Sequence, residues 1–556
     1  MLRTIFNQIK YTITQLPFKR NKIINSRIKE SFGKIKDDSF NFKSIERYFR
    51  HKDNSASYQI LSDKTCNDLD FDELFMYLDR TNSRVGQQYY YNRLRNINID
   101  KHQTELDEKI ITEFTKNTEL RISIQKKLDQ LSHKDSFYIA TLFQEEHISR
   151  PKRFYIIPVL SFASLITLIT SFFIPSFFIL LILLFCINFA IHYWNKNNII
   201  QYVNSLPQLL KFNNIASNLF ANSLLKKLNP NLLKSIKIIN TVRNSMFFFK
   251  LEAKLQGEFA IIAWFIFEQI KTLFLLEPLL LFRVLKKLDN KRIEIEDEFK
   301  FIGHIDMLIS IASLRNGLNH FCIPTIQTNN DTIITNEVKH PLLVNCKTNN
   351  INISKKSILL TGSNMSGKTT FIRTIGINII TGLTINTCFA KSFSLPLLKI
   401  FSAIRISDDL MNDKSYYFEE VLTIKDMLTE SQKNEKSIFL LDEIFKGTNT
   451  VERISAGKAV LSSLTKNNNI VLVSTHDIEL TDMLSEEYEL YHFSETVENK
   501  TVGFDYKLKE GKLKNRNAIR ILEINDYPKE LIKEANKIAE KLDNSYVVLS
   551  QSKKTN

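Results

Sequence analysis

Residues 357–370 read SILLTGSNMSGKTT, and this stretch decides the fold of the second half of the chain. Ser357–Leu360 is a short apolar run typical of a buried strand. Residues 362–369 match the pattern GxxxxGK[ST] in full, and a helix-like run follows from Thr370. A flexible Gly/Ser turn is the alternative interpretation, and the strand before and the helix after it disfavour that alternative. The segment therefore predicts a phosphate-binding loop between a strand and a helix.

Each residue type in this loop has a chemical reason to be there. Glycines let backbone N–H groups wrap a phosphate, Lys368 reaches the β and γ oxygens, and the Thr369 hydroxyl helps to hold Mg²⁺. The residues predicted to bind the nucleotide are Gly362, Ser363, Asn364, Met365, Ser366, Gly367, Lys368, Thr369 and Thr370.

Two later apolar runs end in residues suited to phosphate chemistry. Residues 437–441 lead into Asp442 and Glu443, and residues 470–474 are followed closely by His476. We expect Asp442 to share the magnesium with Thr369, and Glu443 to orient and deprotonate the attacking water. A lone histidine is more often a surface or packing residue, but this position favours contact with the γ-phosphate. Alternating strand and helix signals to about residue 480 indicate an α/β domain.

Composition limits the classes of protein that fit. The 556 residues are 44% hydrophobic and 24% charged, which excludes disorder for most of the chain and suggests several domains. Lys+Arg exceed Asp+Glu by 75 − 60 = 15, a basic excess that suits nucleic acid or an anionic membrane without choosing between them. The five cysteines form no CxxC pair, which argues against a zinc module or a disulfide scaffold and fits a reducing compartment.

A long uncharged segment predicts a membrane hairpin. Phe154–Asn195 contains no Asp, Glu, Lys or Arg and is twice as long as one span of about 20 residues requires. A break at Ser171–Pro175 divides it into predicted spans at about Phe154–Phe173 and Phe177–Tyr193. Positive charges flank both outer ends, so we expect a multi-pass protein of the cell membrane with both termini and the α/β domain in the cytoplasm. A buried hairpin in a soluble core is the alternative.

The remaining sequence reads as helical and basic. Phe259–Phe282 is apolar but is interrupted by Glu268, Lys271 and Glu277, and we interpret it as one long buried helix of a soluble domain. The predicted organisation is a basic N-terminal arm (1–59), a helical core in two parts (60–150 and 197–330), the hairpin between them (151–196), the α/β domain (331–526) and a C-terminal helix and tail (527–556).

Three motifs together resemble a known family. The sequences TGSNMSGKTT, LLDEIFKGTNT and STHDIEL, in this order, are similar to the ATPase domain of the MutS family, which is related to the ABC ATPases. The segment RISDDLMNDKSYYFEEV at 405–421 resembles the signature loop of that family. The resemblance implies an ATPase that uses ATP and Mg²⁺, with Lys368, Glu443 and His476 as catalytic residues. It also implies a homodimer in which Ser415 reaches the nucleotide of the partner subunit.

The resemblance extends beyond the ATPase domain. Lys339–Leu343 is similar to the lead-in to that domain, while Asp79–Thr81 and Asp306 resemble parts of the family's helical core. Tyr527–Ile532 resembles the start of the C-terminal dimerisation element. The expected fold class is therefore multidomain α and α/β: a MutS-like helical core with an inserted transmembrane hairpin, followed by an ABC-class P-loop domain.

The sequence also departs from the family. About 60 residues precede the helical core, too few for the mismatch-recognition and connector domains of a repair MutS. Val344 stands where repair members have an adenine-stacking aromatic residue, and Ser363 and Ser366 replace the usual Pro and Gly. Our leading expectation is a membrane-anchored MutS-like ATPase that forms an ATP-gated dimer and binds mismatched or branched DNA. The alternative is an ATP-driven membrane scaffold or mechanical protein without DNA recognition.

Overall fold

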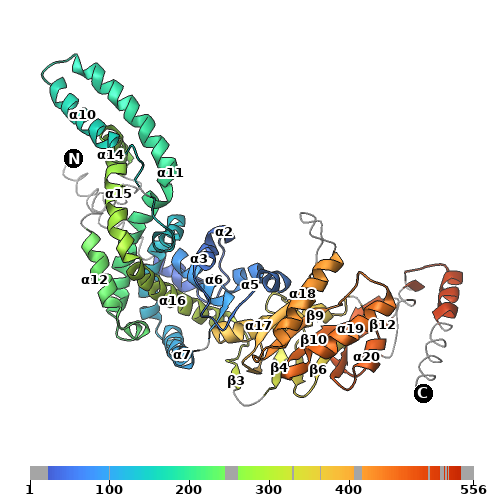
Figure 1. Cartoon of the computed structure of the whole chain (residues 1–556). Helices are drawn as coiled ribbons and strands as arrows, with labels where there is room; N and C mark the ends of the chain where they lie inside the picture. The colour runs from blue at the N-terminus through green and yellow to red at the C-terminus, as the bar shows by residue number, and fades with distance from the viewer. Residues whose placement is uncertain are drawn as a thin grey trace, which may run out of the picture. The chain divides into compact units, whose positions relative to one another are not determined.

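A computed structural model divides the chain into two compact units. The first, which we call the helical unit, comprises Met1–Ser57 and Phe75–Leu318; the second, the α/β unit, comprises Tyr58–Leu74 and Asn319–Asn556 (Figure 1). Multidomain α and α/β architecture is thereby confirmed. The structure describes residues 23–98, 100–148, 150–243, 261–327, 331–363, 365–405, 416–498, 501–513, 519, 522–523 and 525–539.

The helical unit is built around the long helix α16 (Arg292–Gly317). Its Asp306 is fully buried and accepts hydrogen bonds of 2.6–2.9 Å from the backbone and side chains of Asn82 and Ser83. Burial raises the pKa of Asp306, although these hydrogen bonds oppose the rise. A Cβ at Gly86 would lie 2.2 Å from Asp306 Oδ2, so only glycine allows this close approach.

Five of the shorter helices pack against α16: α6 (Arg84–Arg95), α7 (Lys101–Lys116), α8 (Thr118–Leu128), α9 (Thr141–Gln144) and α12 (Leu232–Val242). Three short elements contact α6: α2 (Phe42–Ile45), α3 (Arg47–His51) and β2 (Asn96–Ile97). α5 (Phe71–Leu78) spans the sequence boundary between the two units.

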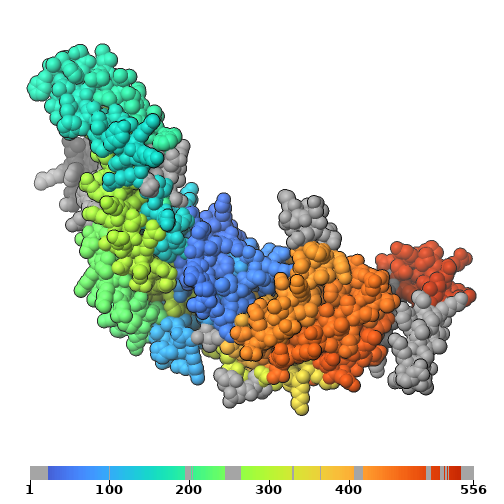
Figure 2. All heavy atoms as spheres, in the orientation of Figure 1, coloured from blue at the N-terminus to red at the C-terminus, as the bar shows by residue number. Residues whose placement is uncertain are grey.

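The uncharged segment forms two helices joined by a short loop. These are α10 (Ile156–Ser171) and α11 (Phe177–Phe220), and the loop between them extends beyond the rest of the helical unit (Figures 1 and 2). Within the described residues, one stretch is long and apolar enough to cross a membrane, Phe177–Trp194, with a mean hydropathy of 2.2. α10 is apolar but has only 16 residues, which is short for a full span, so the expected hairpin of two transmembrane spans stays a prediction.

The second apolar stretch is not one helix. It forms α14 (Ile261–Leu273) and α15 (Leu276–Leu288), separated by Leu275, whose backbone is left-handed at φ 47°. A left-handed residue interrupts the helical hydrogen-bond pattern, so the prediction of a single helix across Phe259–Phe282 was wrong.

The α/β unit contains a six-stranded sheet in the order β14-β11-β6-β10-β9-β8, parallel except for the edge strand β14. The strands are β6 (Ser357–Thr361), β8 (Lys399–Ala403), β9 (Ser437–Asp442), β10 (Ile470–Ser474), β11 (Tyr488–His492) and β14 (Lys509–Glu510). Side chains of the central strands β6, β9 and β10 are almost all buried, as expected for a parallel sheet covered on both faces.

Helices and a smaller sheet complete the unit. The helices are α4 (Asp63–Asp68), α17 (Lys368–Ile385), α18 (Tyr416–Ser431), α19 (Thr450–Leu464) and α20 (Glu479–Met483). The second sheet has the order β3-β7-β4-β5, with β3 (Thr325–Gln327), β7 (Ser392–Pro396), β4 (Ile333–Val338) and β5 (Asn349–Ile353). Short strands lie at β1 (Gln59–Ile60), β12 (Glu495–Glu498) and β13 (Thr501–Phe504).

The segment Tyr58–Leu74 belongs to the α/β unit, whereas the sequence analysis placed residues 60–74 in the helical core. The reason is a set of hydrogen bonds to β8 and the residues after it. Gln59 pairs with the backbone of Ile400 at 2.7 and 2.9 Å, and the buried Asp68 accepts from Ser402 Oγ at 2.6 Å. The later boundary also differs, since the α/β unit resumes at residue 319 rather than 331.

Candidate functional site

The order of strands brings the predicted site residues together. β10 lies between β6 and β9 and is parallel to both, so the carboxyl ends of all three strands meet at one edge of the sheet. The phosphate loop follows β6, Asp442 is the last residue of β9, and His476 lies two residues after β10. Ligands of open α/β sheets bind at such an edge.

The backbone of the loop explains its glycines. Gly367 has φ 106°, which disfavours any L side chain, and a Cβ at Gly362 would lie 2.7 Å from the carbonyl oxygen of Phe493. Met365 also has a left-handed backbone at φ 69° and its side chain is 82% exposed. Asn364, one of the predicted nucleotide-binding residues, lies outside the described residues.

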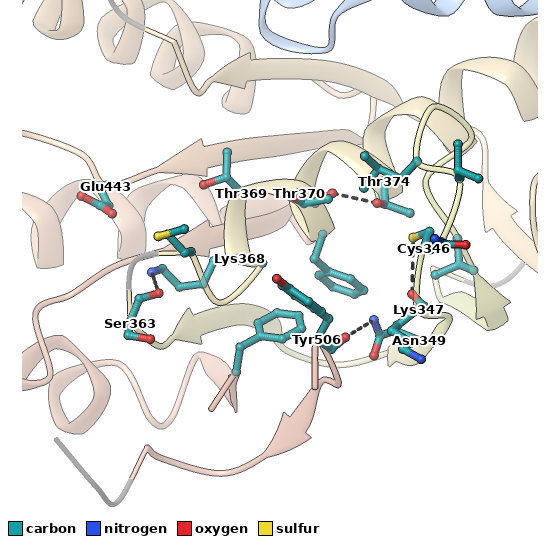
Figure 3. A pocket seen from close by; sticks show the side chains of 18 residues that line it. Cys346, Lys347, Asn349, Ser363, Lys368, Thr369, Thr370, Thr374, Glu443 and Tyr506 are labelled. Carbon is teal, nitrogen blue, oxygen red and sulfur yellow. Dashed lines mark hydrogen bonds between the residues drawn. The ribbon is translucent and has the colours of Figure 1, made fainter. Parts of the chain in front are cut away.

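Lys368 turns back over the loop (Figure 3). Its Nζ donates hydrogen bonds to the carbonyl oxygens of Gly362 (2.9 Å) and Ser363 (3.1 Å), and lies 3.5 Å from His476 Nε2. Burial lowers the pKa of Lys368, although the nearby carboxylates of Glu443 and Asp442 oppose that effect. The ammonium group is thus placed at the mouth of the loop, where a phosphate oxygen would replace the carbonyl contacts.

Thr369 and Asp442 form the pair expected for magnesium. Thr369 Oγ1 donates a 2.7 Å hydrogen bond to Asp442 Oδ2, and the Ser474 hydroxyl donates to the other carboxylate oxygen. These are hard oxygen ligands of the kind Mg²⁺ prefers. Ser366 Oγ is buried without a hydrogen-bond partner among the described atoms, and a phosphate oxygen would satisfy it. The residues present therefore fit a magnesium–nucleotide complex.

Glu443 has the strained backbone common at functional sites, with φ 53°. Its carboxylate contacts His476 Nε2 and Lys446 Nζ, each at 2.8 Å. Burial alone would raise the pKa of Glu443, but the hydrogen bonds and charges of His476 and Lys446 outweigh it and lower this pKa to about 2. The side chain is therefore ionised at neutral pH, so it is able to accept a proton once a water lies beside it.

A cavity of about 520 Å³ adjoins the loop (Figure 3). Seven predicted site residues line it: Ser363, Met365, Gly367, Lys368, Thr369, Thr370 and Glu443. Val344, the residue that the sequence analysis aligned with an adenine-stacking aromatic, also lines the cavity and is 98% exposed. Ser415 lies outside the described residues, so its predicted role across a dimer stays a prediction.

Sequence reasoning missed two residues at this site. Tyr506 lines the cavity, and its Cδ1 atom would lie 3.3 Å from a Cβ at Gly367, which puts an aromatic ring over the phosphate loop. Its backbone oxygen accepts a 3.1 Å hydrogen bond from Asn349 Nδ2. Glu495 accepts a short hydrogen bond from the hydroxyl of Ser363, so the serine that replaces proline has a partner. No local motif marks either residue, since each reaches the loop from more than 130 residues away.

Comparison with known proteins agrees with this geometry. A family model described as MutS domain V matches residues 358–543, which begin in β6 and include the loop, Asp442, Glu443 and His476. Residues 358–543 are therefore similar to the ATPase domain of the MutS family.

Individual MutS proteins align with less than half of the chain. It is 31% identical over 259 residues to the DNA mismatch repair protein MutS of Listeria monocytogenes, an alignment that covers 44% of this chain and 29% of the relative. The DNA mismatch repair protein MutS of Aquifex pyrophilus is 28% identical over 272 residues, covering 47% and 31%. The chain thus matches about three-tenths of the length of these MutS relatives.

Proposed function

We propose that the chain is a membrane-anchored ATPase in which Mg-ATP bound at the phosphate loop joins two subunits. The observation that carries the catalytic part is the convergence of Lys368, the Thr369–Asp442 pair and Glu443 at one sheet edge within a MutS domain V. Lys368 and the loop amides would bind the phosphates, and Thr369 and Asp442 would hold Mg²⁺, which polarises the γ-phosphate. Glu443 would take the proton of the attacking water, and His476 would orient that carboxylate.

Membrane anchoring is supported by the hairpin, which buries polar side chains and exposes apolar ones. The buried residues of α10 are Ser164 and Thr167, whereas Val159 and Phe162 are each 64% exposed. Soluble proteins bury apolar side chains and seldom expose apolar patches larger than a few hundred Å². Helices in a bilayer show the opposite pattern, because lipid surrounds them.

The first half of α11 repeats the pattern. Asn188 is fully buried and donates hydrogen bonds to Ser164 Oγ (2.9 Å) and to the Leu273 carbonyl oxygen (2.7 Å), while Ile179 is 75% exposed. Hydrogen bonds between small polar residues commonly join helices in membranes. At roughly 1.5 Å per residue, the 18-residue stretch Phe177–Trp194 is about 27 Å long, close to the ~30 Å hydrocarbon thickness of a bilayer.

Charge at the base of the hairpin supports its orientation. Lys152 and Arg153 are exposed just before α10, and Arg150 lies over the ring of Phe154 at 5.2 Å. Positive residues beside short spans stay in the cytoplasm. We therefore place both termini and the α/β unit on the cytoplasmic face of the cell membrane.

Dimer formation and DNA binding complete the proposal. The relatives that match are named DNA mismatch repair proteins, and the basic excess of this chain would favour contact with phosphates. In the proposed cycle, ATP closes two α/β units through Ser415 of each chain, and hydrolysis releases them. An ATP-driven membrane scaffold without DNA recognition is the second candidate, favoured by the apolar hairpin within the helical unit.

Three experiments test these parts separately. Lys368→Ala should weaken ATP binding, and unchanged affinity would remove the proposed site. A mixture of Ser415→Ala and Lys368→Ala subunits should recover part of the activity, since one composite site then keeps both residues; no recovery would contradict shared sites. A salt titration of binding to duplex, mismatched and branched DNA decides between the two candidates, because absence of salt-dependent binding to all three favours the scaffold.

A further inference from the structure

The corner between α14 and α15 lies against the apolar half of α11. His192 Nε2 on α11 is 3.4 Å from Glu268 Oε1, and Asn188, one turn nearer the α10–α11 loop, bonds the carbonyl oxygen of Leu273. The pairs 192–268 and 188–273 show that α14 runs toward that loop, antiparallel to α11. The chain then turns at Leu275, whose backbone is left-handed.

α15 returns in the opposite direction. Glu277, near its start, lies 3.9 Å from His192 Nε2, and the ring of Phe282, five residues later, is 5.1 Å from that of Phe154 at the base of the hairpin. Together α14 and α15 form a second, shorter hairpin that packs beside the first, as the position of both helices next to α10 and α11 shows (Figure 1).

α14 exposes apolar side chains and buries charged ones, whereas α15 shows the usual arrangement of a helix in water. Phe265, Ile266 and Ile270 of α14 are 59%, 55% and 42% exposed, whereas its charged Glu268 and Lys271 are buried. α15 buries Leu281, Leu285 and Leu288 and exposes Arg283, Lys286 and Lys287, as a helix beside water does. The apolar surface of the long hairpin therefore continues onto α14 and stops along α15.

A buried ionic cluster joins the two hairpins. It consists of His192, Glu268, Lys271 and Glu277, each no more than 5% exposed. Lys271 Nζ lies 2.7 Å from Glu268 Oε2 and 3.1 Å from Glu277 Oε2. The spacing of His192 and the two glutamates would suit a metal ion, but the ammonium of Lys271 already supplies positive charge between the carboxylates. The cluster thus pairs charges that lipid would not tolerate alone.

We propose that the α14–α15 corner inserts into one leaflet of the bilayer beside the long hairpin, with the ionic cluster holding the two together. This inference rests on the proposed membrane anchoring. Leu273 is level with Asn188, six residues from Trp194, which places the corner about 9 Å inside the base of the span at roughly 1.5 Å per residue. That depth is within one half of a hydrocarbon core of about 30 Å.

The occupant we assign to the exposed face of α14 is lipid rather than a second copy of the chain. Two observations favour lipid: the face continues the apolar surface of α11, and it ends where Arg283, Lys286 and Lys287 are exposed, at the level expected for anionic headgroups. A surface that binds a protein partner has no reason to end at a row of basic residues, whereas a surface that faces lipid does.

Fluorescence quenching by brominated lipid tests the proposal. Cysteines would be introduced one at a time for Ile270 on α14, Ile179 on the long hairpin and Lys286 on α15, all exposed positions, and labelled with bimane. The background carries Cys186→Ala, Cys322→Ser and Cys346→Ser, while Cys66 and Cys388 are buried and remain. Each protein is placed in vesicles of phosphatidylcholine and phosphatidylglycerol, with or without bromine on the acyl chains.

We expect strong quenching at positions 179 and 270 and none at 286. Quenching at 179 alone would overturn the insertion of the corner and leave the long hairpin in the membrane. Quenching at none of the three would overturn the membrane anchor as well. Quenching at 286 would contradict the assigned water boundary. A second copy of the chain is the alternative cover for Ile270. Absence of quenching at position 270, together with a crosslink from that position to a second chain, would assign the exposed face of α14 to a dimer. Phe265→Cys provides a second position on α14.

Discussion

The hydroxyl of Thr369 donates a 2.7 Å hydrogen bond to Oδ2 of Asp442, although 73 residues separate them in sequence. Thr369 is the second residue of α17 and Asp442 is the last residue of β9, so the contact ties the phosphate loop to the adjacent part of the sheet. Both side chains offer oxygen to a divalent cation from fixed elements of structure.

Thr369→Val should therefore lower the affinity for ATP in the presence of Mg²⁺ while leaving magnesium-free binding nearly unchanged. The isosteric change removes one oxygen, and hydrogen bonds to charged groups contribute about 1.5–3 kcal/mol, or roughly 10–100-fold. Titration with a fluorescent ATP analogue, with Mg²⁺ or EDTA, measures both affinities. Thr384→Val is the matched control, because the Thr384 hydroxyl bonds to Ile380 in the same helix. Equal losses with and without Mg²⁺ would contradict the role in metal binding.

Glu443→Gln should retain ATP binding but slow hydrolysis. Glutamine keeps the shape of the side chain and cannot accept the proton of water, and loss of a general base typically costs about 10²–10⁴-fold in rate. Single-turnover hydrolysis measures the chemical step directly. Glu487→Gln, a change away from the loop, should have the wild-type rate. A rate for Glu443→Gln close to that of the wild type would show that another group activates the water.

His340 should make the α/β unit less stable as the solution becomes acidic. Burial lowers the pKa of His340 from 6.5 to about 4, with Arg373 adding to the effect and Asp70 opposing it. Its Nδ1 also accepts a 3.4 Å hydrogen bond from the Leu342 amide, which requires an unprotonated nitrogen. Between these two pKa values the unfolded chain binds more protons, so the stability is complete above pH 6.5 and declines toward pH 4, by about 2 kcal/mol at pH 5.

Thermal unfolding of the full chain in detergent, from about pH 7 to about pH 4.5, measures this decline. His340→Gln should reduce the slope of stability against pH, since glutamine does not titrate in this range. The control is His320→Gln, at an exposed position of the same unit. An unchanged slope for His340→Gln would assign the acid sensitivity to other groups.

Lys271→Met should destabilise the helical unit strongly. The change leaves Glu268 and Glu277 buried without their shared cation, and removing one partner from a buried ion pair costs about 3–5 kcal/mol. Adding Glu277→Gln should restore part of the loss, because one negative charge is then removed. Unfolding in mild detergent measures each variant, and Lys286→Met, at an exposed site on α15, is the control. Equal stability of Lys271→Met and the control would mean that the cluster does not hold the hairpins together.

Local sequence predicted the strands that lead into the candidate site, but it predicted long-range packing poorly. The strands ending at Thr361, Asp442 and Ser474 could be predicted because short apolar runs precede recognisable polar motifs. The attachment of Asp68 to Ser402 could not, since 334 residues separate the two and neither is part of a motif. The left-handed Leu275 carries no signal either, because leucine rarely adopts that backbone and the surrounding packing imposes it.

Charge along the sequence does not show where the charged residues of α14 lie. Glu268 and Lys271 lie in the interior, where they pair with each other and with Glu277, while the exposed side of the helix is apolar. Sequence shows that charged residues are present and does not show whether they are paired. The departure at Ser363 is similar: its hydroxyl donates a hydrogen bond to Glu495 of β12, which lies 132 residues away in the sequence.

α11 is a single continuous helix of 44 residues whose first half is apolar and exposed and whose second half packs in the helical unit. At roughly 1.5 Å per residue it is about 66 Å long, so a tilt of roughly 10° at one end would displace the other by about 11 Å. In the proposed membrane-anchored protein, α11 would act as a lever arm. Rearrangement of the helices around Leu206 and Leu219 would then change the tilt of the hairpin in the bilayer, and a thicker or more curved bilayer would exert torque in return.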